Sequence, residues 1–379
     1  MTTTLSATKP HFEILDGLRG VASVLVVLFH LLETYSAGPA DQIINHGYLA
    51  VDFFFVLSGF VVGYAYDDRW GRMTTWNFFK RRIIRLQPLV VLGTALGASL
   101  FFFAQGDGFP LIGCVPEWKF LLAFVMGCLM IPCGPKMDLR GWGEMNSFNG
   151  PNWSLTWEYV ANILYAVLFR RLSKAALAVL TLLAGFCTLD LCLDWNVWGL
   201  LTESRTAQAY TVIGGWSLTS EQVYIGLTRL FYPFLCGLLL SRCRLRIGGG
   251  FGRCSLLLAV LLALPCVGGA GSILNGLYNA LCILVLFPLI VAAGAGSTIR
   301  SKRGTVVCNT LGALSYPLYI THYPLMYLQM NWVWSHPDAP LHAHLTVAAG
   351  TFLLSIGIAW TALKLYDLPV RDWLTRHWK

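Results

Sequence analysis

Hydrophobic residues make up 56% of the 379 residues and charged residues only 12%, so the chain could not cover a water-exposed surface with polar groups. Most of it must therefore face lipid, which excludes an ordinary soluble enzyme. The formal net charge is +8, but the basic residues border apolar runs, where anionic lipid and topology account for them, and we expect no nucleic-acid binding.

Apolar segments recur along the whole chain, separated by short charged stretches. Most are about as long as an α-helix must be to cross hydrocarbon, whereas membrane strands would be shorter and would alternate. The segments are 14–35, 48–66, 86–103, 120–131, 153–169, 175–193, 223–240, 256–267, 274–293, 311–332 and 345–365. The sequence therefore predicts an all-α integral membrane protein that forms one domain, 1–379.

The distribution of lysine and arginine predicts how many of these segments cross. The loops after the second, fifth, seventh and ninth segments are rich in basic residues and should be cytoplasmic, whereas 33–47, 194–221 and 335–344 are poor in them and should be external. All the basic loops fall on the same side of the membrane only if 120–131, which is too short to cross, is re-entrant or interfacial. We therefore expect a bundle of ten transmembrane helices with both termini cytoplasmic.

The eleven cysteines contain no C-x-x-C pair and no metal-ligand spacing, so we predict no metal site. Most fall inside apolar runs, where cysteine acts as a small hydrophobic residue. Cys114 and Cys133 flank one short external segment and are the one pair that could form a disulfide.

Two ionisable residues lie in the first segment, where hydrocarbon makes charge costly and each such residue is a candidate for the working site. Arg19 and His30 are eleven residues apart, which corresponds to three turns plus roughly 20° and a rise of about 16 Å. They share one helix face, with Arg19 near the cytoplasmic end and His30 in the outer half. The alternative is that Arg19 only anchors the helix and His30 binds a carbonyl in the core.

Other predicted helices contribute further polar residues. Asp52 and Ser58 lie in the second helix, Glu158 in the fifth and His322 near the middle of the tenth, and we place all but His322 in the outer half. The structural alternatives are interhelical hydrogen bonding for Ser58 and ion pairing for Asp52 and Glu158. Gly59, next to Ser58, would let another helix or a ligand approach closely.

A basic stretch precedes the third apolar segment. Arg82 and Arg85 would share one helical face and could bind phosphates, although a basic helix entry also follows from the positive-inside rule. Guanidinium groups on the cytoplasmic side suit a phosphate-bearing donor, and a histidine in the outer half suits removal of a proton from an acceptor hydroxyl. An acyl thioester of coenzyme A fits, because its pantetheine arm could lie along the face from Arg19 to His30.

Five stretches, in this order and spacing, make the sequence resemble the acyltransferase family 3 membrane enzymes, which O-acylate polysaccharides and related glycans. The most specific is the Arg-x10-His pattern. The stretches are LDGLRGVASVLVVLFH with Arg19 and His30, VDFFFVLSGFVV from Val51, RIIRLQP with Arg82 and Arg85, NWSLTWE from Asn152, and LSYPLYITHYP from Leu314.

The resemblance implies transfer of an acyl group, in the first place acetyl, from cytoplasmic acyl-CoA to a hydroxyl of an external glycan or glycolipid. It implies ten spanning helices, in agreement with the loop charges. It also implies that Arg19 and His30 are the essential pair, that Arg82 and Arg85 lie on the donor side, and that Glu158 and His322 are supporting positions.

Our mechanistic hypothesis is that His30 acts as general base and that Glu158 or Asp52 orients its imidazole. A covalent acyl-His30 intermediate is the main variant. The predicted donor-binding residues are Arg19, Arg82, Arg85, Ser58 and His322. A competing hypothesis is a transporter or flippase for a lipid-linked glycan or acyl group, which predicts an inverted repeat with broken helices; the sequence shows no such repeat, although Pro317 and Pro324 interrupt the tenth segment.

Overall fold

The computed structural model describes residue 9 and residues 11–378, and their regular structure is entirely helical. The helices, in chain order, are α1 (Glu13–Glu33), α2 (Ala50–Tyr66), α3 (Thr75–Leu100), α4 (Glu117–Cys128), α5 (Asn152–Val167), α6 (Lys174–Cys192), α7 (Ser220–Cys243), α8 (Phe251–Ala263), α9 (Ile273–Leu281), α10 (Phe287–Ala295), α11 (Lys302–Thr321), α12 (Tyr323–Ser335), α13 (Leu341–Thr361) and α14 (Leu368–His377). π-helical turns join α9 to α10 and α13 to α14, and one residue, His322, separates α11 from α12.

Seven helical segments among the described residues are long and apolar enough to cross a membrane: Glu13–Glu33, Gly47–Tyr66, Thr75–Leu100, Lys174–Cys192, Ser220–Cys243, Ile273–Ala295 and Leu341–His377. The predicted all-α membrane fold is therefore confirmed. The shorter α5 and α8 and the α11–α12 pair complete the ten helical units that the sequence predicts, and ten crossings stay a prediction. The separate α4 has 12 residues, too few to span hydrocarbon.

Helix α3 begins eleven residues before the apolar segment 86–103 that predicted it. Thr74 caps its start by accepting a hydrogen bond from the backbone N–H of Asn77 (3.1 Å). The first turns carry the basic residues that a search for apolar runs excludes. As a result Arg82 and Arg85 lie on a formed helix that continues into the bundle.

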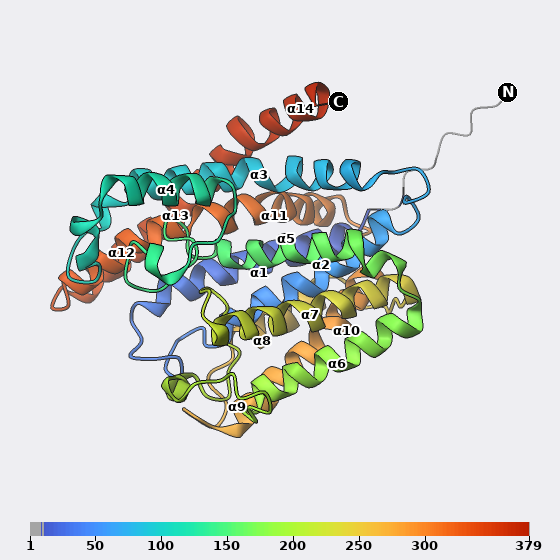
Figure 1. The fold of residues 1–379 in the computed structure, drawn as a ribbon, viewed down its shortest axis with the longest axis horizontal. Coiled ribbons are helices and arrows are strands. Elements are labelled where there is room, and N and C mark those ends of the chain that lie inside the picture. The colour runs from blue at the N-terminus through green and yellow to red at the C-terminus, as the bar shows by residue number, and fades with distance from the viewer. Residues whose placement is uncertain (1–8, 10, 379) are drawn as a thin grey trace.

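The helices run along the long axis of the molecule, and their connections gather at its two ends (Figure 1). At one end, loops predicted to be cytoplasmic contact one another. The Arg242 guanidinium binds the Asp67 carboxylate (2.7 Å) and the Leu172 carbonyl (3.0 Å), and Arg170 lies 4.0 Å over the ring of Trp70. The loops that the charge pattern assigns to one side thus form one surface.

Loops predicted to be external meet at the opposite end. The Asn331 side chain donates to the Gln105 carbonyl (3.1 Å), and the rings of Tyr35 and His344 lie 5.7 Å apart. The chain ends, residues 1–8 and 379, lie outside the described residues. Lys9 nevertheless pairs with Asp68 (2.6 Å), so the start of the described chain lies at the same end as the predicted cytoplasmic loops.

Cys114 and Cys133 are free thiols, so the disulfide considered from the sequence is not formed. Cys114 is exposed, whereas Cys133 is buried with its sulfur 3.8 Å from that of Met126. Their environments differ because Cys133 packs under α4 while Cys114 lies before it.

Glycines bring the central helices into backbone contact. A methyl group on Gly59 in α2 would collide with the carbonyl oxygen of Phe234 in α7, and one on Gly237 in α7 would collide with that of Val56 in α2. Small residues at such crossings are the usual means by which membrane helices pack closely. Of the two partners expected beside Gly59, a helix or a ligand, the structure shows a helix, α7.

We expect Gly59→Ala to lower the free energy of unfolding by about 1–3 kcal/mol, because the added methyl must push α2 away from α7. The thermal unfolding midpoint in detergent measures this effect. Gly350→Ala in α13 is the matched control, since nothing lies within 4 Å of the position of its new methyl group. Equal midpoints for the two variants would contradict the close packing.

Candidate active site

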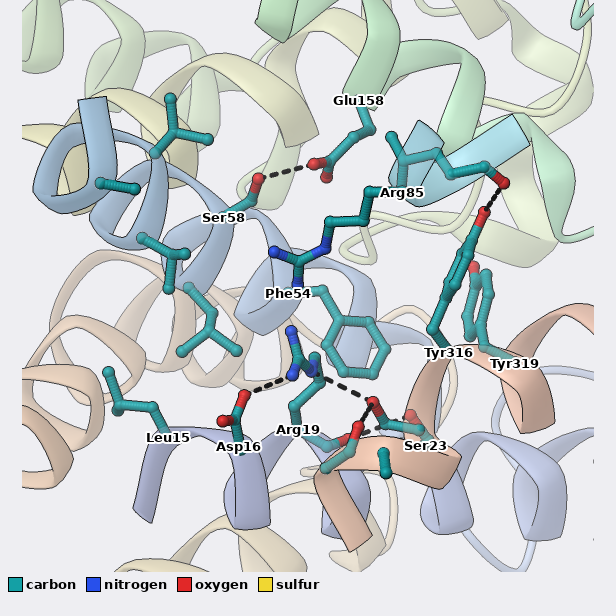
Figure 2. A pocket seen from close by; sticks show the side chains of 18 of the residues that line it. Leu15, Asp16, Arg19, Ser23, Phe54, Ser58, Arg85, Glu158, Tyr316 and Tyr319 are labelled. Atoms are coloured by element: carbon teal, nitrogen blue, oxygen red, sulfur yellow. Dashed lines mark hydrogen bonds and ion pairs between the residues drawn. The ribbon is translucent and has the colours of Figure 1, made fainter. Parts of the chain in front are cut away.

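A cavity of about 640 Å³ lies between α1, α2, α3, α5 and α11 and is closed at one side by the α13–α14 junction. Polar side chains from several helices line it, and Figure 2 shows part of this lining. Five of the predicted site residues line it: Arg19, Ser58, Arg82, Arg85 and Glu158. Residues from four helices, far apart in the sequence, therefore meet in one space.

Glu158 lies with the basic residues of this cavity and not with His30. Its Oε1 accepts hydrogen bonds from the Arg82 guanidinium (2.5 Å) and from the Ser58 hydroxyl (2.8 Å). The predicted contact in which Glu158 orients His30 is therefore not formed, because Glu158 is bound to Arg82 and Ser58. Glu158 is six residues into α5, about 9 Å along its axis, which carries it from the helix start to the depth of Arg82.

Arg19 faces α11 in the same cavity. Its guanidinium pairs with Asp16 one turn earlier and donates to the Ser315 hydroxyl (3.1 Å). Arg371 at the far side of the cavity pairs with Asp367 (3.1 Å). These cations are therefore neutralised by neighbouring carboxylates, as the cost of charge in a membrane requires.

Arg85 differs from these arginines. Figure 2 shows its side chain directed into the cavity between Glu158 and Arg19, and it makes no hydrogen bond or ion pair with any described residue. A guanidinium carries five N–H donors in a planar fork that matches carboxylate and phosphate oxygens. The cavity thus holds a guanidinium whose N–H groups are not bonded to any described carboxylate.

His30 lies further along α1, outside the lining of the cavity. Ser23 is a lining residue, and His30 follows it by seven residues, about 10 Å. The Nδ1 atom of His30 lies 3.0 Å from Oε2 of Glu33. Glu33, at i+3 on the same helix, therefore holds the position that the sequence assigned to Glu158 or Asp52, and the i, i+3 spacing is the signal that could have identified it.

Asp52 also has a different place from the predicted one. It is fully buried and forms a two-atom contact with the Arg229 guanidinium (2.7 and 3.3 Å). Arg229 also donates to the carbonyls of Tyr48 (2.6 Å) and Gly214 (3.2 Å). Breaking such a buried pair leaves a charge without compensation, so we assign Asp52 to the α2–α7 packing and not to the catalytic set.

His322 occupies the break between α11 and α12 and is completely buried. Its ring stacks on His30 with centroids 5.6 Å apart, and it lies 6.1 Å from the ring of Tyr319, which lines the cavity. Its Nδ1 atom is 3.0 Å from the Leu318 carbonyl. A donor-binding residue should line the cavity, and His322 does not. It lies instead between Tyr319, which lines the cavity, and His30.

A hydrogen bond joins two residues of the cavity lining. The hydroxyls of Ser154 and Tyr319 lie 2.7 Å apart, and both residues line the cavity. Beyond this pair come the rings of His322 and His30. The site therefore has two layers, an arginine layer within the cavity and a histidine layer beyond its end.

A buried carboxyl lies on the other side of the histidine layer, in the loop before α5. Glu144 accepts a hydrogen bond from the Tyr327 hydroxyl (2.8 Å), and burial raises its pKa to about 8 from a usual value of 4.5. Tyr323, whose ring contacts both Tyr327 and His30 at 4.8 Å, separates Glu144 from His30. No sequence pattern identified Glu144, because it lies in a loop without helical periodicity.

We expect the stability of the protein to fall as pH rises from about 4.5 to about 8, partly through Glu144. In this interval the unfolded chain has lost the proton of this carboxyl while the folded protein keeps it, so raising the pH favours unfolding. Glu144→Gln should flatten the curve of unfolding midpoint against pH. The exposed Glu203→Gln is the control and should leave the slope unchanged; an unaltered slope in Glu144→Gln would disprove the assignment.

Among the described residues, no group of three His, Cys, Asp or Glu side chains could hold a metal ion.

Comparison with known proteins identifies the family of the chain. A family model described as an acyltransferase domain matches residues 12–363. The chain is 38% identical over 170 residues to "Protein 2 in picA locus" of Rhizobium radiobacter, covering 43% of this chain and 85% of that protein. It is 25% identical over 327 residues to "Acyltransferase MdmB" of Streptomyces mycarofaciens, covering 82% and 77%. No solved structure matches the chain. Because the family model spans most of its length, the protein belongs to the acyltransferase family 3 and is a membrane acyltransferase.

Proposed function

We propose that this protein transfers an acyl group, in the first place acetyl, from acyl-CoA on the cytoplasmic side to a hydroxyl of a glycan or glycolipid on the external side of a bacterial inner membrane. Membership of an acyltransferase family supports the reaction class and favours it over the transporter or flippase hypothesis. The donor, the acceptor and the direction are our proposals.

One observation carries the choice of donor: Arg85 is unpaired in a cavity where Arg19, Arg82 and Arg371 already have carboxylate partners. The cavity lies toward the end of the bundle that carries the basic loops. Coenzyme A offers phosphate groups, which a guanidinium binds through charge-assisted hydrogen bonds. We therefore assign the phosphates of the donor to Arg85, with Arg19 and Arg82 positioned beside it.

The thioester end of such a donor would extend along α1 toward His30. The route leads past Ser154 and Tyr319, whose hydrogen bond must open, to the ring of His322 and then to His30. Acyl groups that are short pass this point most easily, which favours acetyl.

In the proposed step, His30 takes the proton of the acceptor hydroxyl, and the hydroxyl oxygen attacks the thioester carbonyl carbon. The carbon–sulfur bond then breaks, and the leaving thiolate receives the proton from the imidazolium. Glu33, at 3.0 Å from Nδ1, fixes the tautomer that leaves Nε2 free and stabilises the imidazolium formed during the step. Glu33 is thus a positioning residue, and His30 is the catalytic residue.

We expect Arg85→Met to weaken coenzyme A binding by about ten- to a hundredfold, because it removes charge-assisted hydrogen bonds to phosphate. Isothermal titration of the purified protein with coenzyme A measures this change. Arg81→Met, at the exposed neighbouring position in α3, is the matched control and should bind normally. If both variants bind alike, Arg85 is not the phosphate site.

We expect His30→Ala to abolish acyl transfer while coenzyme A still binds. Glu33→Gln should lower kcat by about ten- to a hundredfold without changing the dissociation constant of coenzyme A, because the imidazole loses its orienting carboxylate. The exposed Glu117→Gln should retain the full rate. If Glu33→Gln lowers the unfolding midpoint as well as kcat, whereas Glu117→Gln changes neither, Glu33 has a structural role instead.

A further inference from the structure

Three asparagines recur at every third position in the segment that enters α5. The backbone N–H of Asn149 donates to the carbonyl of Asn146 (3.0 Å), and that of Asn152 donates to the carbonyl of Asn149 (3.0 Å). The three residues therefore lie on consecutive turns. Their side chains are buried, with exposed fractions of 5%, 1% and 1%, and we call them the asparagine ladder.

Most of the amide groups of the asparagine ladder have no hydrogen-bond partner among the described residues. Both polar side-chain atoms of Asn146 and Asn152, and Oδ1 of Asn149, are buried and unpaired. Only Nδ2 of Asn149 is occupied, by the Ile320 carbonyl (2.7 Å). A buried amide without a partner is costly, so three adjacent ones indicate that another molecule satisfies them.

The ladder adjoins the histidine layer. Asn149 binds Ile320, two residues before His322, and the Tyr319 hydroxyl lies 3.3 Å from the Pro151 carbonyl. A Cβ on Gly150, inside the ladder, would lie 2.9 Å from the ring of Tyr323, and that ring contacts His30 at 4.8 Å. The unpaired amides are thus next to the residues that surround the proposed base.

His322 adds a further unpaired atom. Its Nδ1 faces the Leu318 carbonyl, which can only accept, so Nδ1 carries the proton and Nε2 is an acceptor. This Nε2 atom is buried and has no partner among the described residues. The ladder and His322 together offer four acceptor atoms and two NH2 groups.

The combination of four acceptor atoms and two NH2 groups indicates which kind of ligand can satisfy the site. A phosphate or carboxylate can accept from the two NH2 groups but has no proton to donate to the four acceptors. A hydroxyl both donates and accepts, and a sugar ring carries several hydroxyls at the spacing of neighbouring carbons. A neutral, hydroxyl-rich molecule therefore matches the set better than an anion.

We propose that Asn146, Asn149 and Asn152, with Nε2 of His322, form the binding site for the sugar of the acceptor and hold one of its hydroxyls within reach of His30. This inference rests on the proposed acyl transfer and adds the location and chemistry of the acceptor site. It separates the two substrates, with the donor phosphates at Arg85 and the acceptor at the start of α5.

The test uses purified full-length protein, acetyl-CoA, and three probe acceptors: p-nitrophenyl β-D-glucoside, β-D-galactoside and N-acetyl-β-D-glucosaminide. We expect Asn152→Ala and Asn146→Ser each to raise the KM for the accepted sugar about tenfold, through loss of hydrogen bonds to its hydroxyls. Coenzyme A affinity should not change. Asn331→Ala is the control, because its amide oxygen is also unpaired but lies on α12 at the end of the bundle.

The outcomes are distinct. An unchanged KM in both ladder variants, with normal coenzyme A binding as proof of folding, would overturn the acceptor site. So would a wild-type protein that hydrolyses acetyl-CoA but acetylates none of the three sugars. A wild-type protein that neither cleaves acetyl-CoA nor binds coenzyme A would instead overturn the proposed function. If Asn152→Ala does not fold, binding of the accepted sugar to the His30→Ala protein, with and without the milder Asn146→Ser, decides the question.

Discussion

Compensation of buried charge is the constraint on which the arrangement of this bundle depends. The Asp52–Arg229 pair joins α2 to α7, Arg82–Glu158 joins α3 to α5, and Arg242–Asp67 ties α7 to the loop after α2. Each pair connects segments far apart in the sequence, so the pairs specify neighbours as well as neutralise charge. Hydrocarbon contributes little to such specificity, because lipid tails are as apolar as the helices that they surround.

Within this framework, the residues that lack compensation are the ones to which we assign substrate binding. Arg85 is a cation without a carboxylate, and the asparagine ladder consists of amides without partners. These two sets differ in chemistry, one suited to an anion and the other to hydroxyls. Helix α1 spans both, because it carries Arg19 in the cavity and His30 beyond its end.

The sequence predicted the all-α membrane fold and the short α4 from apolar length alone, since hydrocarbon thickness acts directly on the number of residues. It also selected Arg19, Arg82 and Arg85, which the structure brings to one cavity. Loop charge and helical spacing were sufficient for these three because both are local properties of the chain.

Partner choice was not predictable in the same way. Glu158 binds Arg82 and Asp52 binds Arg229, so both carboxylates assigned to His30 are engaged elsewhere. Depth along a helix indicates the layer in which a residue lies, but not which neighbouring helix it faces. Arg229, Asn146 and Asn149 escaped notice because their significance depends on contacts between segments more than 100 residues apart, as in the bond from Asn149 to Ile320.

The hydrogen bond between Ser154 and Tyr319 has a consequence for the membrane itself. A cell maintains ion gradients across this barrier, and a continuous polar passage through the bundle would dissipate them. The Ser154 and Tyr319 hydroxyls bond to each other, and ring contacts lead from Tyr319 to His322 and on to His30. Side chains packed in this way would let an enzyme with the proposed two-sided reaction take up its substrates without a continuous aqueous path through the bundle.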